Sequence, residues 1–146
     1  MSHYPVNHPL RPFYRVLAAL AGLYVLVFGV VGTVRTLGAP LFDRSDVVVL
    51  GLRTNLAFAL MSIGAGVVIL LAWFVGRNVD RAVFIWGGVG FMTVGTALLA
   101  LLHTELNVLN FSMPTVIVSF SLGMLLFTAG MYGLSGPVAT KAQTAE

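Results

Sequence analysis

The sequence of 146 residues contains no cysteine. Disulfide bonds, thiol redox chemistry, cysteine-ligated zinc or iron–sulfur clusters and covalent attachment of c-type haem are therefore excluded. A four-span disulfide or quinone reductase that relies on a cysteine pair is excluded for the same reason. We expect no cofactor and no metal site in this protein.

Charged residues are also scarce, because they make up only 9% of the chain while apolar residues make up 58%. A soluble domain carries about 25% charged residues, so this chain has too few to cover a surface that faces water. The composition therefore indicates an integral membrane protein. We expect membrane lipids among its partners, and no nucleic acid.

Four long uncharged runs lie between the few charged residues and prolines. Each run has 19 to 23 residues, and about 20 residues of helix cross the ~30 Å hydrocarbon core of a membrane. Lipid offers no hydrogen-bonding partner to a free backbone group, so each run should form a helix. The predicted spans are residues 13–34, 54–76, 82–102 and 114–134.

The predicted fold is an all-α, integral membrane four-helix bundle built from two helical hairpins in a single domain, residues 1–146. Its other segments are outer loops at 35–53 and 103–113, an inner turn at 77–81 and a flexible tail at 135–146. No cleavage site of the A-x-A type follows the first apolar run, so we expect it to be a retained helix and not a signal peptide.

The basic residues predict the orientation, because cytoplasmic loops carry an excess of Lys and Arg. If both termini are inside, the inner side holds five basic residues and the outer side holds three. The inner set is Arg11, Arg15, Arg77, Arg81 and Lys141, and the outer set is Arg35, Arg44 and Arg53. We expect a multi-pass protein of the plasma membrane with its N-terminus and C-terminus inside.

No ionisable residue lies in the middle of any predicted span. Proton relays, ion-coupled transport and voltage sensing normally need such residues. The hydroxyl groups within the spans are of a kind that usually hydrogen-bonds to the preceding turn or to a neighbouring helix. The sequence therefore predicts no catalytic residues, and we expect that the protein is not an enzyme.

Small residues four positions apart recur in every predicted span. Examples are Ala18 with Gly22, Ser62 with Gly66, and Ser119 with Gly123. Helices associate in lipid through close van der Waals contact, which small residues allow. We expect these residues to pack the bundle internally. The alternative is that one of these stripes contacts another membrane protein or a second copy of the chain.

The two outer loops hold the candidate contact residues. The apolar run Val47–Leu52 is too short to span a membrane, so it forms an interfacial or re-entrant segment or a short strand over the outer end. Together with Asn107–Phe111 it forms a predicted outer cap. The candidate residues are Arg53, Asn55, Asn107, Asn110 and Phe111. They form either a hydrogen-bonded network that closes the bundle or a contact surface.

Two further polar residues, His103 and Glu105, are weak candidates at the end of the third span. Residues two apart on a helix point to different faces, and a metal site needs more ligands than this pair supplies. We interpret them as a polar helix end among the lipid headgroups. Just beyond, Ser112 and Pro114 have the order expected for the N-cap and first turn of the fourth helix.

The inner turn places Asp80 between Arg77 and Arg81. Charges of both signs at adjacent positions in a short turn predict a solvated turn that also sets the orientation. Anionic lipid headgroups are possible ligands for the arginines.

Three segments carry a resemblance to a known family. They are "RPFYRVLAALAGLYVLVFGVVG" (Arg11–Gly32), "GLRTNLAFALMSIGAGVVIL" (Gly51–Leu70) and "NVLNFSMPTVIVSFSLG" (Asn107–Gly123). The chain resembles a family of small four-span actinobacterial membrane proteins of unknown function. Such proteins often carry His near the start of the second span, where this chain has Phe58 and Ser62. The resemblance implies the topology and the membrane location, but no activity.

Three functional hypotheses follow from the sequence. The first is an accessory or structural component of the plasma membrane or of a larger membrane assembly, without catalytic machinery. The second is a small oligomeric transporter or permeability protein, for which the hydroxyl groups of the third and fourth spans would have to form a polar path. The third is a lipid-interacting or enzyme-like protein with a site at its outer face.

Overall fold

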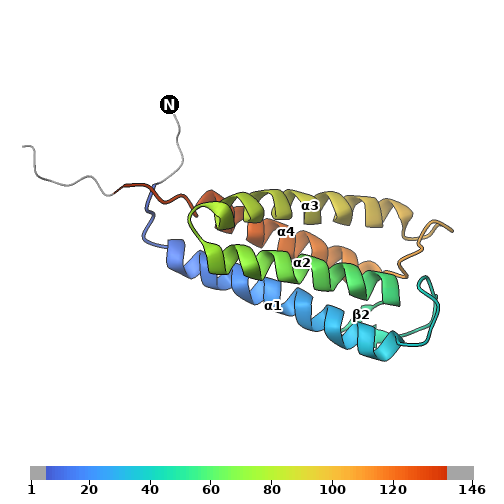
Figure 1. Cartoon of the computed structure of the whole chain (residues 1–146). Coiled ribbons are helices and arrows are strands. Elements are labelled where there is room, and N and C mark those ends of the chain that lie inside the picture. Colours follow the sequence, from blue (N-terminus) through green and yellow to red (C-terminus); the bar gives the residue numbers. More distant parts are fainter. Residues whose placement is uncertain (1–5, 138–146) are drawn as a thin grey trace, which may run out of the picture.

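The computed structural model describes residues 6–137, which form an all-helical bundle of four helices (Figure 1). The helices are α1 (Arg11–Thr36), α2 (Leu56–Val75), α3 (Val79–Leu101) and α4 (Met113–Met131). Each is long and apolar enough to cross a membrane, so the predicted all-α, four-span bundle is confirmed. Residues 138–146 of the predicted flexible tail lie outside the described residues.

Successive helices run in opposite directions, so the bundle has two distinct ends (Figure 1). We call one the termini end, which holds residues 6–10, the α2–α3 turn and residues 132–137. The other is the loop end, which holds the α1–α2 and α3–α4 loops. A two-stranded antiparallel hairpin lies within the α1–α2 loop and consists of β1 (Val48–Val49) and β2 (Leu52–Arg53).

Local sequence signals determine where several helices begin and end. Asn55 is the N-cap of α2, because its side-chain oxygen accepts a hydrogen bond from the Phe58 N–H at 2.9 Å. Ser112 is the N-cap of α4 and Pro114 lies in its first turn, which confirms the predicted helix start. Gly76 ends α2 with φ at 61°, a conformation that glycine adopts without a steric penalty.

Glycines bring the two helices of each hairpin into close contact. A Cβ atom placed on Gly29 of α1 would lie 2.7 Å from the Ala59 carbonyl oxygen of α2. A Cβ atom on Gly88 of α3 would likewise lie 2.7 Å from the Gly123 carbonyl oxygen of α4. The backbones therefore touch where a side chain is missing, and the predicted internal packing of small residues is confirmed at these positions.

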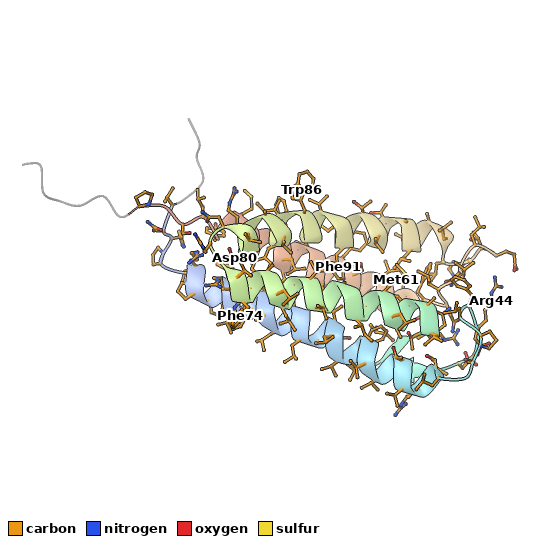
Figure 2. The ribbon with its side chains drawn as sticks, viewed as in Figure 1. Arg44, Met61, Phe74, Asp80, Trp86 and Phe91 are labelled. Carbon is orange, nitrogen blue, oxygen red and sulfur yellow. The ribbon has the colours of Figure 1, made fainter. Side chains whose placement is uncertain are left out.

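Contacts between the two hairpins are far fewer than contacts within each hairpin. All four helices share one apolar cluster nearer the termini end, and its buried residues are Ala18 and Ala21 of α1, Ile69 of α2, Phe84 of α3, and Leu126 and Ala129 of α4. The outer surface of the bundle carries large apolar side chains. Phe74 of α2 and Trp86 of α3, for example, are 82% and 74% exposed and project away from the bundle (Figure 2).

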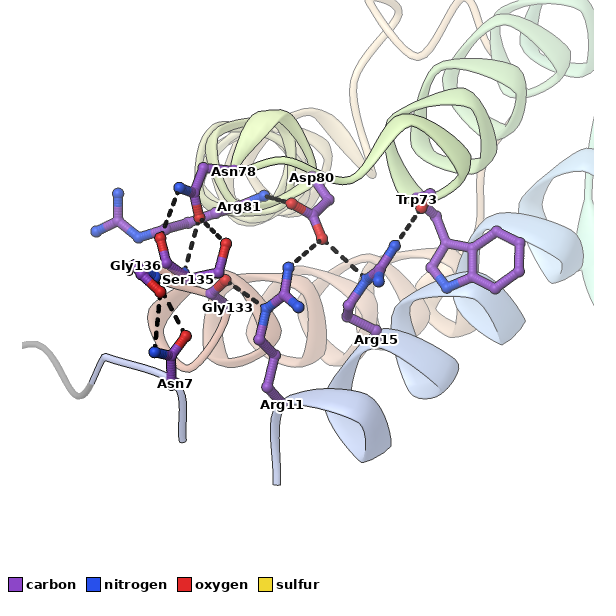
Figure 3. Close-up of polar contacts among 10 residues, drawn as sticks. All are labelled: Asn7, Arg11, Arg15, Trp73, Asn78, Asp80, Arg81, Gly133, Ser135 and Gly136. Atoms are coloured by element: carbon purple, nitrogen blue, oxygen red, sulfur yellow. Dashed lines mark hydrogen bonds and ion pairs between the residues drawn. The ribbon is translucent and has the colours of Figure 1, made fainter. Parts of the chain in front are cut away.

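Asp80 is buried at the termini end, so the predicted solvated turn was wrong at this residue. Its side chain is 1% exposed, and its Oδ2 lies 2.9 Å from Arg15 Nε and 3.5 Å from Arg11 Nη2 (Figure 3). Both arginines come from the N-terminal part of α1, and Asp80 lies in the first turn of α3. Arg15 also donates a hydrogen bond to the Trp73 carbonyl at the end of α2. One carboxylate therefore joins the two hairpins.

The segments before α1 and after α4 extend this polar network (Figure 3). The Asn78 side chain accepts a hydrogen bond from the Ser135 N–H at 2.9 Å and donates one to the Ser135 carbonyl at 2.9 Å. The Asn7 side chain pairs in the same way with the backbone of Gly136. We call this network the termini clamp. Its side chains are Asn7, Arg11, Arg15, Asn78, Asp80 and Ser135.

Replacement of Asp80 tests the importance of the termini clamp. Asp80→Asn keeps the shape of the side chain but leaves the two arginines without a counter-charge. Breaking a buried ion pair costs about 3–5 kcal/mol, and we expect roughly 2–4 kcal/mol here because the arginine side chains are partly solvated. The loss should appear as a lower thermal unfolding temperature in detergent. As a control, Glu105→Gln removes an exposed partner of Arg44 and should leave that temperature unchanged; equal effects of the two variants would contradict the prediction.

Candidate functional site

A cavity of about 400 Å³ lies between the two hairpins. All four helices and β2 contribute to its wall. Representative lining residues are Phe28 of α1, Met61 of α2, Phe91 of α3, Val118 of α4 and Leu52 of β2. None of the lining residues is charged, and nearly all are apolar. The cavity therefore suits an apolar molecule.

The cavity is closed towards both ends of the bundle. At the loop end, Val49 and Leu52 of the β-hairpin pack on Phe28, and the Phe28 and Phe58 rings meet edge to face at 5.3 Å. Towards the termini end, the shared cluster around Phe84 fills the space between the helices. Access from the water at either end is therefore blocked by packed side chains.

The cavity opens sideways, between α2 and α3. A Cβ atom placed on Gly64 of α2, or on Gly87 or Gly90 of α3, would meet no other atom within 4 Å. Met61 and Val94 line the cavity and are also 62% and 50% exposed at the surface of the bundle. Figure 2 shows Met61 and Phe91 in the space where α2 and α3 face each other. In a membrane this opening faces lipid.

The cavity wall contains few polar groups, and most of them are already hydrogen-bonded. The Ser62 hydroxyl donates to the Phe58 carbonyl at 2.8 Å, and the Ser119 hydroxyl donates across the helix pair to the Phe91 carbonyl at 2.7 Å. The Tyr24 hydroxyl, by contrast, has no hydrogen-bonding partner among residues 6–137. Tyr24 is therefore a lining residue whose polar atom has no partner within the described part of the chain.

The structure places two of the predicted outer-cap residues in contacts that cross between the hairpins. Asn55 is 0% exposed, and besides capping α2 it donates a hydrogen bond to the Val108 carbonyl at 2.8 Å. Asn110 is 8% exposed and donates to the Ser45 carbonyl at 2.6 Å. Each amide thus reaches the loop of the other hairpin, and together they tie the two loops.

The other three outer-cap residues have more local roles. The Asn107 side chain accepts from the Phe111 N–H at 3.1 Å and donates to the Phe111 carbonyl at 3.0 Å, which folds the α3–α4 loop. The Phe111 ring is buried against Leu98. Arg53 pairs with Asp46 at 2.7 Å on the surface. Most of this set is therefore directed inward, into the bundle, and Arg53 is the exposed member.

The weak candidates His103 and Glu105 do not form a pair. Glu105 binds Arg44 of the α1–α2 loop, with 3.0 Å between Arg44 Nη1 and Glu105 Oε2. His103 is exposed beside it. Within residues 6–137, no group of three or more His, Cys, Asp or Glu residues is placed to hold a metal ion.

The cavity was not predicted from the sequence, although the segment "WGGVG" (Trp86–Gly90) of α3 contained a signal for it. Glycines at positions 87, 88 and 90 cannot all lie on one face of a helix. Gly88 contacts α4, while Gly87 and Gly90 face the cavity. The sequence alone does not say which of the three meets a partner helix.

Comparisons with protein-family models, curated proteins and solved structures found no match for this chain. The resemblance to a four-span actinobacterial family therefore stays a prediction.

Replacement of Asn55 tests whether the crossed amides hold the loop end together. Asn55→Ala removes an N-cap, which costs about 0.5–2 kcal/mol, and a buried hydrogen bond, which contributes about 1 kcal/mol. Asn55→Ser keeps a capping oxygen but cannot reach Val108, so its effect should be smaller. Thermal unfolding in detergent measures both effects. His103→Ala should not change the unfolding temperature, and a loss as large as that of Asn55→Ala would contradict this assignment.

Proposed function

We propose that this chain is a non-catalytic, four-span protein of the plasma membrane that holds the apolar chain of a membrane lipid between its two hairpins. The observation that supports the proposal is the cavity, which is apolar, closed at both ends and open to the side between α2 and α3. The proposal keeps the accessory, non-enzymatic role predicted from the sequence. It places the lipid contact inside the bundle instead of at an outer face.

The size of the cavity supports a bound molecule. Ligand sites usually measure about 300–1,000 Å³, and this cavity of about 400 Å³ lies within that range. The atoms that line an empty cavity lack van der Waals partners on one side. A lipid chain that enters through the side opening supplies these contacts. Close packing is the main attraction available inside a membrane, because lipid and side chains are equally apolar.

The same geometry argues against the transporter hypothesis. A permeation path needs polar groups from one side of the membrane to the other. Here the apolar cluster around Phe84 and the β-hairpin close the two ends, and the Ser62 and Ser119 hydroxyls are engaged with backbone carbonyls. A protein partner or a second copy of the chain stays a prediction from the sequence.

Filling the cavity tests the proposal. Gly87→Leu should place a side chain into open space, so the variant should fold normally while excluding a lipid chain. After purification in a mild detergent, the wild-type chain should retain a stoichiometric lipid in an organic extract analysed by mass spectrometry. Gly87→Leu should lose it.

The matched control is Ala100→Leu, which enlarges an exposed residue of α3 outside the cavity wall. It should retain lipid as the wild type does. The proposal fails if the wild-type chain carries no bound lipid, or if Gly87→Leu carries as much as the wild type.

The proposed orientation has both termini in the cytoplasm, because five basic residues then lie inside and three outside. A fluorescent reporter that matures only in the cytoplasm, fused after Glu146, should be fluorescent. A phosphatase that is active only outside should be inactive at the same position. The opposite pair of results would show that the C-terminus lies outside, and it would not contradict the proposal that the cavity binds a lipid.

A further inference from the structure

Tyr24 is the feature of the cavity that apolar packing does not explain. Ser and Thr hydroxyls in a helix can bond to the carbonyl of the preceding turn, as Thr33 does to Gly29 at 2.8 Å. A tyrosine hydroxyl lies at the far end of a rigid ring and cannot make this bond. Because Tyr24 also lacks another partner among residues 6–137, its hydroxyl remains free to bind a ligand.

The depth of Tyr24 restricts which polar group can reach it. Tyr24 lies 13 residues after the start of α1 and 12 before its end. At 1.5 Å per residue it is about 18–20 Å from either end, close to the middle of a ~30 Å hydrocarbon core. The ester groups of a phospholipid lie outside that core, in the interfacial region. A phospholipid can therefore place a chain here, but not an oxygen.

The cavity wall restricts the ligand further. No charged side chain lines it, so a charged headgroup would be buried without a counter-charge. Three phenylalanines, Phe28, Phe58 and Phe91, line the cavity together with Tyr24. Aromatic rings pack well against another flat ring. The wall thus suits a neutral molecule with a planar ring, an apolar chain and an oxygen that accepts a hydrogen bond.

We infer that the cavity binds a neutral lipid of the prenylquinone class, with a ring carbonyl that accepts a hydrogen bond from the Tyr24 hydroxyl. This inference rests on the proposed lipid-binding function and names the ligand class. The isoprenoid chain lies along the apolar wall towards the opening between α2 and α3. The proposed contact is a binding contact, and it includes no redox step.

The test compares two probes, a short-chain prenylquinone and an isoprenoid hydrocarbon of similar length without oxygen. Native mass spectrometry of the full chain in detergent gives the affinity for each. Tyr24→Phe keeps the ring and removes the hydroxyl, so it should lower the affinity for the quinone by about three- to tenfold. Its affinity for the hydrocarbon should not change. Tyr132→Phe, which removes a hydroxyl outside the cavity wall, is the matched control and should bind both probes like the wild type.

Infrared spectroscopy gives a second measurement that needs no variant. In the wild-type complex, hydrogen bonding should lower the quinone carbonyl stretching frequency from its value in detergent alone. An unshifted band, or equal quinone affinity in Tyr24→Phe and the wild type, would overturn the inference. If Gly87→Leu still loses its lipid in that case, the proposed lipid binding stands. If the wild type binds neither probe and retains no lipid, both proposals fail.

Discussion

Close backbone contact at glycines is the interaction on which this architecture depends. Inside a membrane no hydrophobic force draws helices together, so association requires surfaces that approach closely. In this protein the closest helix contacts of the described glycines lie within each hairpin, at positions such as Gly29 and Gly88. Gly64 and Gly87, which would be suited to join α2 with α3, face open space instead. The hairpins are therefore two well-packed units with a gap between them, and that gap is the cavity.

Polar contacts hold the two units together at the ends, where the interfacial region begins. At the termini end, Asp80 of the second hairpin binds Arg11 and Arg15 of the first. At the loop end, Asn55 and Asn110 each reach a backbone carbonyl of the opposite hairpin. This division of roles explains why the middle remains open while both ends are closed. The side opening faces the membrane, and the wall behind it is mostly apolar.

The sequence predicted the helices well because their signals are local. Uncharged runs of sufficient length give the spans, and Ser112 with Pro114 marks the start of α4. Asp80 was misread because its nearest charges in the sequence are Arg77 and Arg81, whereas its ion-pair partners are Arg11 and Arg15, more than 60 residues earlier. The cavity could not be predicted either, because composition does not reveal which glycine meets a neighbouring helix. Facts that depend on how the hairpins pack require the three-dimensional structure.

Packing explains the aromatic ring of Tyr24 but not its hydroxyl. Phe28 and Phe58 show that a phenyl ring satisfies the packing of this wall without a polar atom. A hydroxyl in the hydrocarbon region has a desolvation cost unless it finds a partner. Within residues 6–137 no side chain or backbone group supplies one, and the side opening leads only to lipid. A lipid ligand with an oxygen near the middle of the membrane would accept a hydrogen bond from this hydroxyl and offset its desolvation cost. Such a ligand accounts for both the tyrosine and the cavity.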